Sequence, residues 1–330
     1  MNNEFTALKA YIGQQGLLQP TTAFYVRRVV MAMAIIAASV TILATVTNFW
    51  AQMANAVFLA FAFGQLGLFS HDVGHGQIVG ARWHRLMCMW LNALLGWSLS
   101  WWIHKHNRHH AFPNQPGYDP DVDIKFIAFS ENQAHKKKGW YRTVARYQHI
   151  LFIPLLLFEL WSLRCASISY LLRQRTAKAA TDLLLIAAHL ALYITLLLFF
   201  LTPWHALVFA AIHTGMVGIY LGLIFAPNHK GMPMIEHKSA MSYLQQQILT
   251  SRNVHGGWLV DFIYGGLNYQ IEHHLFPSMP RNRLKHAAPI VERFCKEIDV
   301  SYLAVSVPES FRLIFSHLAR VGKAVPSGSS

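Results

Sequence analysis

Charged residues are scarce in this chain of 330 residues. Only 13% of the residues are Asp, Glu, Lys or Arg, whereas 54% are hydrophobic. Soluble domains carry about 25% charged residues, so the composition indicates a membrane protein. The chain has 15 acidic and 28 basic residues, which gives a formal net charge of +13. An excess of this sign is typical of proteins that bind nucleic acid or face an anionic membrane surface.

Basic residues are missing from two long intervals. Their distribution distinguishes a membrane protein from a nucleic-acid-binding protein. No Lys or Arg lies between Arg28 and Arg82, or between Lys178 and Lys230. The basic residues therefore fall in three blocks, as expected for loops on one side of a bilayer. A DNA-binding face is disfavoured, and we expect no nucleic-acid partner.

Cysteine is also rare, and its spacing excludes two kinds of site. Cys88, Cys165 and Cys295 stand far apart with no CxxC motif, which argues against a disulfide framework and against a thiolate metal site. There is no HExxH motif, the main signature of zinc proteases. The apolar run after Arg27 and Arg28 is too long for a signal peptide, so we expect none.

Two apolar intervals are each long enough for two membrane crossings. Residues 29–70 and 183–226 each hold about twice the ~20 residues that one transmembrane helix needs. Their polar midpoints, 47–52 and 202–205, contain no Lys or Arg. By the positive-inside rule we expect both turns outside, with both termini and the central segment in the cytosol.

The expected fold is an all-α, multi-pass integral membrane protein with a single catalytic domain. Four transmembrane helices form two hairpins, and a cytosolic helical cap carries clusters of histidine. Two shorter apolar runs, near 86–102 and 150–161, are expected to be interfacial or re-entrant helices. The expected segments are a cytosolic N-terminal segment (1–28), the first hairpin (29–70), a cytosolic and interfacial region (71–182), the second hairpin (183–226), a cytosolic region (227–324) and a disordered tail (325–330).

Seven of the 19 histidines fall in three clusters with helical spacing. The clusters are His71-Asp-Val-Gly-His75, His106-Asn-Arg-His109-His110 and Gln270-Ile-Glu-His273-His274. On a helix that turns about 100° per residue, the two histidines of the first cluster lie about 40° apart. The three of the second cluster fit within an arc of about 100°, whereas His104 points away from it. Gln270 takes the place in the third cluster that His106 has in the second.

Clustered imidazoles indicate a metal site without naming the metal, because imidazole suits iron, zinc and copper. Seven histidines exceed the four ligands of a tetrahedral zinc ion, so two metal ions are the natural inference. Candidate acceptors for the imidazole N–H groups are Asp72, Asn107 and Glu272, which lie beside the ligands. His189, His205 and His213 lie in or near the apolar intervals. A haem held by two of them is an alternative, but hydrogen bonding between helices is the commoner use of such residues.

The three clusters resemble the histidine boxes of the membrane fatty acid desaturase family. The stretches FAPNHKGMP and GGLNYQIEHHLFPSMPR are similar to bacterial acyl-CoA and acyl-lipid desaturases of the front-end-like branch, and the resemblance covers about residues 25–305. It implies a non-haem centre of two Fe at the cytosolic membrane face. The ligands it implies are His71, His75, His106, His109, His110, His273 and His274, with His229 as a further ligand and Asn228 and Gln270 as weaker or supporting groups.

The activity implied is O2-dependent insertion of a cis double bond into a long-chain acyl-CoA or acyl-lipid. Gln270 stands where the best-described acyl-CoA desaturases have histidine. It occurs in the front-end branch, whose members often carry a fused cytochrome b5 domain. This sequence has no HPGG motif, so we expect a separate electron donor, either a ferredoxin with its reductase or a free cytochrome b5. Basic residues that could dock the donor are Lys136, Lys137, Lys138, Arg281 and Arg283.

The remaining expectations concern the substrate and the alternatives. Trp101, Trp102, Tyr264 and Tyr269 are expected to line an acyl tunnel. The acidic residues Asp119, Asp121 and Asp123 are expected to end the helix of the second box and form turns. A diiron hydroxylase on the same scaffold is the alternative enzyme. A different class is a non-catalytic membrane receptor or a haem-binding electron carrier.

Overall fold

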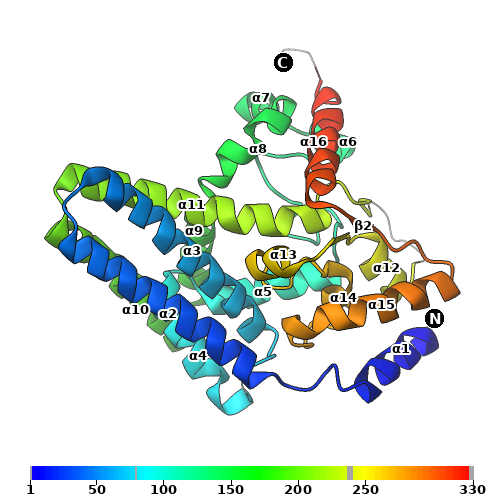
Figure 1. The fold of residues 1–330 in the computed structure, drawn as a ribbon. Coiled ribbons are helices and arrows are strands. Elements are labelled where there is room, and N and C mark those ends of the chain that lie inside the picture. The colour runs from blue at the N-terminus through cyan, green and yellow to red at the C-terminus, as the bar shows by residue number, and fades with distance from the viewer. Residues whose placement is uncertain (1, 79, 236–240, 327–330) are drawn as a thin grey trace. The chain divides into compact units, whose positions relative to one another are not determined.

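The computed structural model describes residues 2–78, 80–235 and 241–326, whose regular structure is almost all helical (Figure 1). The all-α prediction is confirmed. The chain folds as two compact units. Unit 1 comprises Met1–Gln19, Lys105–Pro154 and Leu223–Ser330, and unit 2 comprises Pro20–His104 and Leu155–Gly222.

The elements alternate between the two units along the chain. Unit 2 contains α2 (Thr22–Thr45), α3 (Phe49–Gly74), α4 (Ala81–Leu95), α9 (Glu159–Gln174) and α10 (Ala177–Phe200). Three helices continue from one unit into the other: α5 (Leu99–Ala111), α8 (Gln148–Leu156) and α11 (Pro203–His229). Unit 1 contains α1 (Asn2–Gln14), α6 (Glu131–His135), α7 (Gly139–Arg146), α12 (Tyr243–Leu249), β1 (Asn253–Val254), α13 (Trp258–Ile263), α14 (Gln270–Leu275), α15 (Arg281–Glu297), β2 (Ala304–Val305) and α16 (Val307–Lys323).

Four helices are long and apolar enough to cross a membrane: α2, α3, α10 and α11. They have 24 to 27 residues, more than the ~20 that one crossing needs. The helices α2 and α10 begin before the predicted starts at 29 and 183, because each extends into its basic flank, past Arg28 and Lys178. The chain is therefore a multi-pass membrane protein.

Two further helix pairs are sharply bent where the shorter apolar runs were predicted. Residues 83–95 and 99–111 meet at 105°, and residues 148–156 and 159–174 meet at 72°. Such bends occur in broken spans and in re-entrant helices. The first bend matters for function, because α5, which follows it, carries the second histidine cluster.

The carbonyl groups at the end of α4 are capped by side chains from α9 and α10. Gly96 ends the helix with φ of 72°, a left-handed conformation that favours glycine. The buried Arg164 guanidinium donates to the carbonyl of Leu95 at 3.3 Å. The imidazole of His189 donates from Nδ1 to the carbonyl of Ala93 at 3.1 Å. These bonds satisfy orphan helix-end acceptors where water is scarce.

Polar side chains also hold the start of α5. The backbone N–H of Ser98 donates to the Ser167 hydroxyl at 3.2 Å, and the N–H of Leu99 donates to Asn92 Oδ1 at 2.6 Å. All four residues are buried. The direction in which α5 leaves α4 is thus fixed by hydrogen bonds within unit 2.

Histidines within the apolar helices bond to other helices, as expected for polar groups in a membrane. His189 also lies 3.3 Å from Arg164. His213 Nδ1 lies 2.8 Å from the Tyr193 hydroxyl, joining α11 to α10. These contacts favour a structural role for both histidines over haem ligation.

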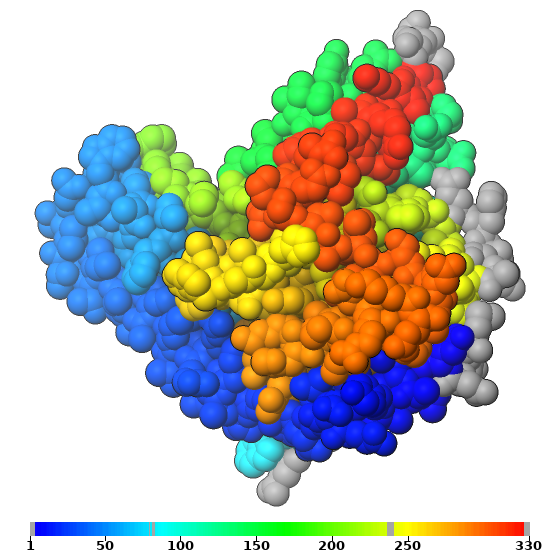
Figure 2. Space-filling model, turned by 45° about the vertical axis from the view of Figure 1, so that its right-hand side comes forward, coloured from blue at the N-terminus to red at the C-terminus, as the bar shows by residue number. Residues whose placement is uncertain are grey.

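The short helix α14, which carries the third histidine cluster, is held by its neighbours. It packs on α12, α15 and β1, and all of its six residues are buried. A helix of this length is unstable alone. Asn253 in β1 accepts from the Ile271 N–H at 2.9 Å, and β1 pairs in parallel with β2. On the outer side, α1 lies against α15, as the dark blue and orange surfaces of Figure 2 show.

The last two described residues make contacts with the rest of unit 1. Val325 is buried, and the Arg146 guanidinium donates to its carbonyl at 3.4 Å and to that of Pro326 at 2.7 Å. Val325 belongs to an apolar cluster of buried residues, and the disorder expected from 325 onward stays a prediction. Residues 327–330 lie outside the described part.

Candidate metal centre

Six histidines gather inside unit 1. His106, His109 and His110 come from α5, His229 ends α11, and His273 and His274 lie on α14. Positions i, i+3 and i+4 share one helix face, so α5 directs its three rings together. The ring centroids of His110 and His274 are 4.3 Å apart, and those of His109 and His229 are 4.6 Å apart. His273 and His274 are fully buried.

Three of these imidazoles form one compact group. One ring nitrogen from each of His109, His229 and His274 lies within 4.8 Å of the other two. All three residues are buried. The group joins three elements that are far apart in the sequence, so it exists only in the folded chain.

An oxygen atom fixes the tautomer of each ring in this group. His109 Nδ1 lies 2.9 Å from Asp119 Oδ2, and His229 Nδ1 lies 3.0 Å from the carbonyl of Thr250. A carbonyl oxygen and an ionised carboxylate only accept, so both Nδ1 atoms carry the proton. The Nε2 atom of each ring is then an acceptor, and that of His229 accepts from Gln270 Nε2 at 3.0 Å.

The third ring is oriented by an amide. His274 Nδ1 lies 2.8 Å from Gln247 Oε1, and Gln247 Nε2 donates to the carbonyl of His110 at 3.2 Å. The second bond sets which end of the amide faces His274, so Nδ1 again donates. His274 Nε2 is buried without a hydrogen-bond partner in the described structure.

A buried, unpartnered lone pair is the observation that tests the site against a metal ion. Leaving such an acceptor unsatisfied costs about 1–3 kcal/mol, and a metal ion satisfies it. Burial and the neighbouring imidazoles hold the pKa of His274 well below its usual range, so the ring is neutral, the form that coordinates metals. N–H to oxygen bonds behind each imidazole are typical of metal sites. The residues present fit a metal ion.

Asp119 serves two purposes at this site. It is fully buried. Its Oδ1 accepts from the Asp121 N–H at 2.8 Å, which is a turn contact, and its Oδ2 accepts from His109 and from the Asn114 N–H at 2.8 Å. Asp121 pairs with Lys105. The turn role expected for these acids is therefore incomplete for Asp119, which also orients an imidazole.

The other three histidines of unit 1 form a second group beside the first. His106 Nε2 and His110 Nε2 are 3.0 Å apart. The ring centroid of His273 lies 4.8 Å from that of His110 and 6.3 Å from that of His106. Two ring nitrogens this close can share a proton or a metal ion, because two facing lone pairs alone repel.

His71 and His75 lie at the end of α3 in unit 2. Their ring centroids are 4.7 Å apart, as expected for i and i+4. The carboxylate of Asp72 is fully buried and lies 3.1 Å from His71 Nδ1, which gives this ring the same oxygen support. Trp102 packs against His71 with ring centroids 5.4 Å apart.

The polar residues predicted beside the ligands have different placements. Asn107 is exposed. Asn228 is buried and donates to Gln270 Oε1 at 3.0 Å. Gln270 Nε2 lies 3.0 Å from His229 Nε2, so the two amides line the edge of the first group.

Glu272 has partners other than an imidazole. Its two oxygens accept from Asn253 Nδ2 at 2.8 Å and from the Tyr302 hydroxyl at 2.9 Å. Burial raises the pKa of Glu272 to about 7. These bonds tie α14 to β1 and to the segment before β2, so Glu272 fixes the helix that carries His273 and His274.

The four residues predicted for an acyl tunnel lie in two places. Trp101 is buried and Trp102 half-buried in unit 2, next to the first cluster. Tyr264 is buried and Tyr269 half-buried in unit 1. The tunnel remains a prediction.

Sequence reasoning did not identify the residues that accept from the Nδ1 atoms of the first group. They are Gln247, Thr250 and Asp119. Gln247 and Thr250 lie on and just after α12, outside every histidine cluster, and the Thr250 contact uses its backbone carbonyl. No residue-type pattern encodes a backbone acceptor. Asp119 lies in the acid-rich stretch after the second cluster, which was a usable signal.

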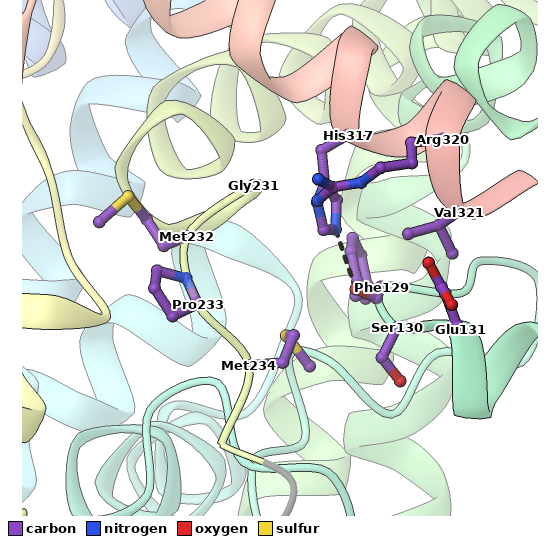
Figure 3. A pocket seen from close by; sticks show the side chains of 10 residues that line it. All are labelled: Phe129, Ser130, Glu131, Gly231, Met232, Pro233, Met234, His317, Arg320 and Val321. Carbon is purple, nitrogen blue, oxygen red and sulfur yellow. Dashed lines mark hydrogen bonds between the residues drawn. The ribbon is translucent and has the colours of Figure 1, made fainter.

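A cavity of about 330 Å³ lies elsewhere in unit 1, between α16 and the chain after α11 (Figure 3). His317 Nε2 donates across it to the Phe129 carbonyl at 2.9 Å. Its lining contains no histidine of the metal groups: Phe129, Ser130, Glu131, Gly231, Met232, Pro233, Met234, His317, Arg320 and Val321.

The basic residues expected to dock an electron donor are only partly available. Arg281 is fully buried. Lys137 Nζ donates to the carbonyls of Ile124 and Lys125 at 2.8 Å each. Lys136 and Lys138 remain on the surface near them.

Comparison with known proteins identifies the family of this chain. The family model described as fatty acid desaturase matches residues 48–306. The chain belongs to the fatty acid desaturase family. The matched region of this desaturase family member contains α3 through β2, and with them all eight candidate ligands.

Several curated relatives of this chain carry names of acyl-lipid or fatty acid desaturases. An "Acyl-lipid (9-3)-desaturase" of Physcomitrium patens is 34% identical over 97% of this chain. A "Delta(5) fatty acid desaturase fat-4" of Caenorhabditis elegans is 28% identical over 92% of it, and a "Delta(8)-fatty-acid desaturase" of Euglena gracilis is 28% identical over 84%. The chain spans 63% of the length of the first of these proteins and 70% of each of the other two.

Proposed function

We propose that this chain is an O2-dependent fatty acid desaturase that places a cis double bond in a long-chain acyl group. The reaction removes one hydrogen from each of two adjacent methylenes. O2, two electrons and two protons are consumed, and two water molecules leave with the alkene. The observation that carries this proposal is the buried group of His109, His229 and His274, in which one ring nitrogen of each lies within 4.8 Å of the other two and each Nδ1 lies next to an oxygen atom.

Two iron ions are the cofactor that this donor set supports best. Iron, when bound, supplies the oxidising chemistry that an unactivated methylene requires and that side-chain acids and bases lack. His109, His229 and His274 would hold one ion. The resemblance of the histidine boxes to those of the family implies the remaining ligands for the other ion: His71, His75, His106, His110 and His273.

The residues of the chain have three tasks in this proposal. Asp72, Asp119 and Gln247 accept the Nδ1 protons and so keep the imidazoles in the coordinating tautomer. Glu272 fixes α14 by its bonds to Asn253 and Tyr302. Burial of the ligands keeps bulk water away from the reacting carbon, which limits side reactions.

The topology proposed is two transmembrane hairpins, α2 with α3 and α10 with α11, and a cytosolic cap. The absence of Lys and Arg between Arg28 and Arg82 and between Lys178 and Lys230 supports it. Both termini and the metal centre then face the cytosol. A separate donor there, either a ferredoxin with its reductase or a free cytochrome b5, would supply the electrons.

The acyl substrate needs an apolar path to the metal centre. We propose that Trp101, Trp102, Tyr264 and Tyr269 contribute to that path, and the packing of Trp102 on His71 supports this for Trp102. The path would fix which methylene reaches the metal. Acyl-lipid and acyl-CoA substrates are both compatible with it.

Product analysis tests the function. The full chain is expressed in a desaturase-deficient host, and its fatty acids are analysed by mass spectrometry with location of the double bond. We expect a new monounsaturation or additional unsaturation that His274→Ala and His109→Ala abolish. A hydroxylated acyl chain instead of an alkene would identify the hydroxylase alternative. Full activity in both variants would refute the ligand assignment.

A further inference from the structure

We infer that a pocket in unit 2 binds the phosphate group of the acyl-lipid substrate. The inference rests on the proposed function, since it names the carrier of the acyl chain. The pocket has a volume of about 300 Å³ and lies between α4, α5 and α10. That volume is at the lower end of the range for small-ligand sites and suits a headgroup.

Two cations line this pocket without acidic partners. Arg85 comes from α4 and Lys178 from the first turn of α10. Neither forms an ion pair within the described residues. Phosphate oxygens are the acceptors that such groups bind with charge-assisted hydrogen bonds.

The other polar groups of the pocket already have partners. His84 Nε2 donates to the carbonyl of Val73 at 3.0 Å, and Thr181 donates to the carbonyl of Ala177 at 3.0 Å. Ser100 donates to Asp182 Oδ2 at 2.6 Å. The donors left for a ligand are therefore the two cations.

Among the residues that line the pocket, Asp182 is acidic, and its carboxylate would repel an anionic ligand. Its charge is met by two hydroxyls, because Ser98 donates to the same oxygen as Ser100, at 3.2 Å. Two cations against one carboxylate leave the pocket with a net positive charge. The start of α10 adds the positive end of a helix dipole.

We expect the pocket to lie at the depth of lipid headgroups, because it is lined by the start of a candidate membrane span. Lys178, Thr181 and Asp182 belong to the first two turns of α10, which is a candidate membrane span. A phospholipid already anchored by its acyl chains brings its phosphate to this level, whereas coenzyme A arrives from water.

The outer face of α4 supports the same depth. Trp83, Leu86 and Trp90 are exposed there and lie along one face of the helix. Such a face is typical of a helix in the membrane interface. Arg85, on another face of α4, turns toward the pocket.

Direct binding tests the inference without any activity assay. The purified full chain in detergent is titrated with dioleoylphosphatidylglycerol, dioleoylglycerol and coenzyme A, and bound ligand is counted by native mass spectrometry. We expect saturable binding of the phospholipid only. Arg85→Gln and Lys178→Gln should each weaken it about fivefold, the effect of one cation near an anionic lipid.

The matched control is Arg173→Gln, which removes an exposed cation of unit 2 that does not line the pocket. It should change binding less than twofold, and thermal melting should show all variants folded. Equal binding of phospholipid and dioleoylglycerol would overturn the inference, as would equal losses in pocket and control variants. Binding of coenzyme A instead of the phospholipid would also overturn it.

The proposed function is tested separately. If the wild-type chain desaturates host lipids but shows no phosphate-dependent binding, the inference fails and the function stands. If it produces no alkene in any lipid, the function itself fails.

Discussion

Replacing Asp119 by asparagine is expected to weaken metal binding while leaving the fold in place. The substitution keeps the size of a fully buried side chain. It removes the charge opposite His109 Nδ1, and an amide can turn an N–H group toward that proton. His109 then loses the bond that fixes its tautomer and ring orientation.

The structure allows the size of the effect to be worked out. Asp119 Oδ2 accepts from His109 at 2.9 Å and from the Asn114 N–H at 2.8 Å. Asparagine keeps only one acceptor oxygen, and these two donors would compete for it. Losing a support of this kind lowers metal affinity by about 10–100-fold. That range corresponds to about 1.4–2.7 kcal/mol of binding free energy.

Asp123→Asn is the matched control. Asp123 is exposed and lies four residues along the same loop, where its Oδ2 accepts from the Gly117 N–H at 2.8 Å. It is not among the residues grouped around the histidines. We expect wild-type metal affinity for this variant.

The assay is competition for Fe(II) with a chelator of known affinity, under anaerobic conditions, on purified protein in detergent. Melting temperatures monitor the fold of each variant. Metal affinity of Asp119→Asn equal to that of Asp123→Asn would refute the assignment of Asp119 as the residue that orients His109.

Three further predictions concern other parts of the molecule. Gln247→Leu removes the acceptor of His274 Nδ1 and should lower Fe(II) affinity about 10–100-fold in the same competition assay, whereas unchanged affinity would contradict the tautomer assigned to that ring. Gly96→Ala places a methyl group 2.3 Å from His189 Cδ2 at a φ of 72°. It should cost at least about 1 kcal/mol of stability, seen as a lower melting temperature. Burial lowers the pKa of His317, so stability should fall as pH drops below about 6.5, where the unfolded chain takes up the proton first, by at most about 1.4 kcal/mol per pH unit. His317→Gln should flatten this dependence in melting curves between pH 7.5 and 5.5, and an unchanged slope would contradict the assignment.

The local parts of the candidate metal centre were predictable from the sequence. Helical spacing alone places His106, His109 and His110 on one face, and the structure has them on one face of α5. The apolar intervals likewise predicted the four long helices, with starts up to seven residues late. Both results depend on periodicity and hydropathy, which are properties of neighbouring residues.

The supporting contacts of the centre could not be predicted in this way. The bond from Gln247 to His274 joins residues 27 positions apart in the sequence, and the bond to His229 comes from the backbone of Thr250. Glu272 was expected to accept from an imidazole because it precedes His273. In the folded chain it turns to Asn253 and Tyr302. Tertiary packing chooses among the partners within reach, and a motif does not record that choice.

Iron analysis of the purified chain tests the central claim most directly. The histidine groups predict close to two irons per chain, retained in detergent, and an absorption spectrum without a Soret band. The double variant His109→Ala/His274→Ala should retain less iron than the wild type. A Soret band, or iron content unchanged in that variant, would contradict the account of these histidines as a non-haem iron site.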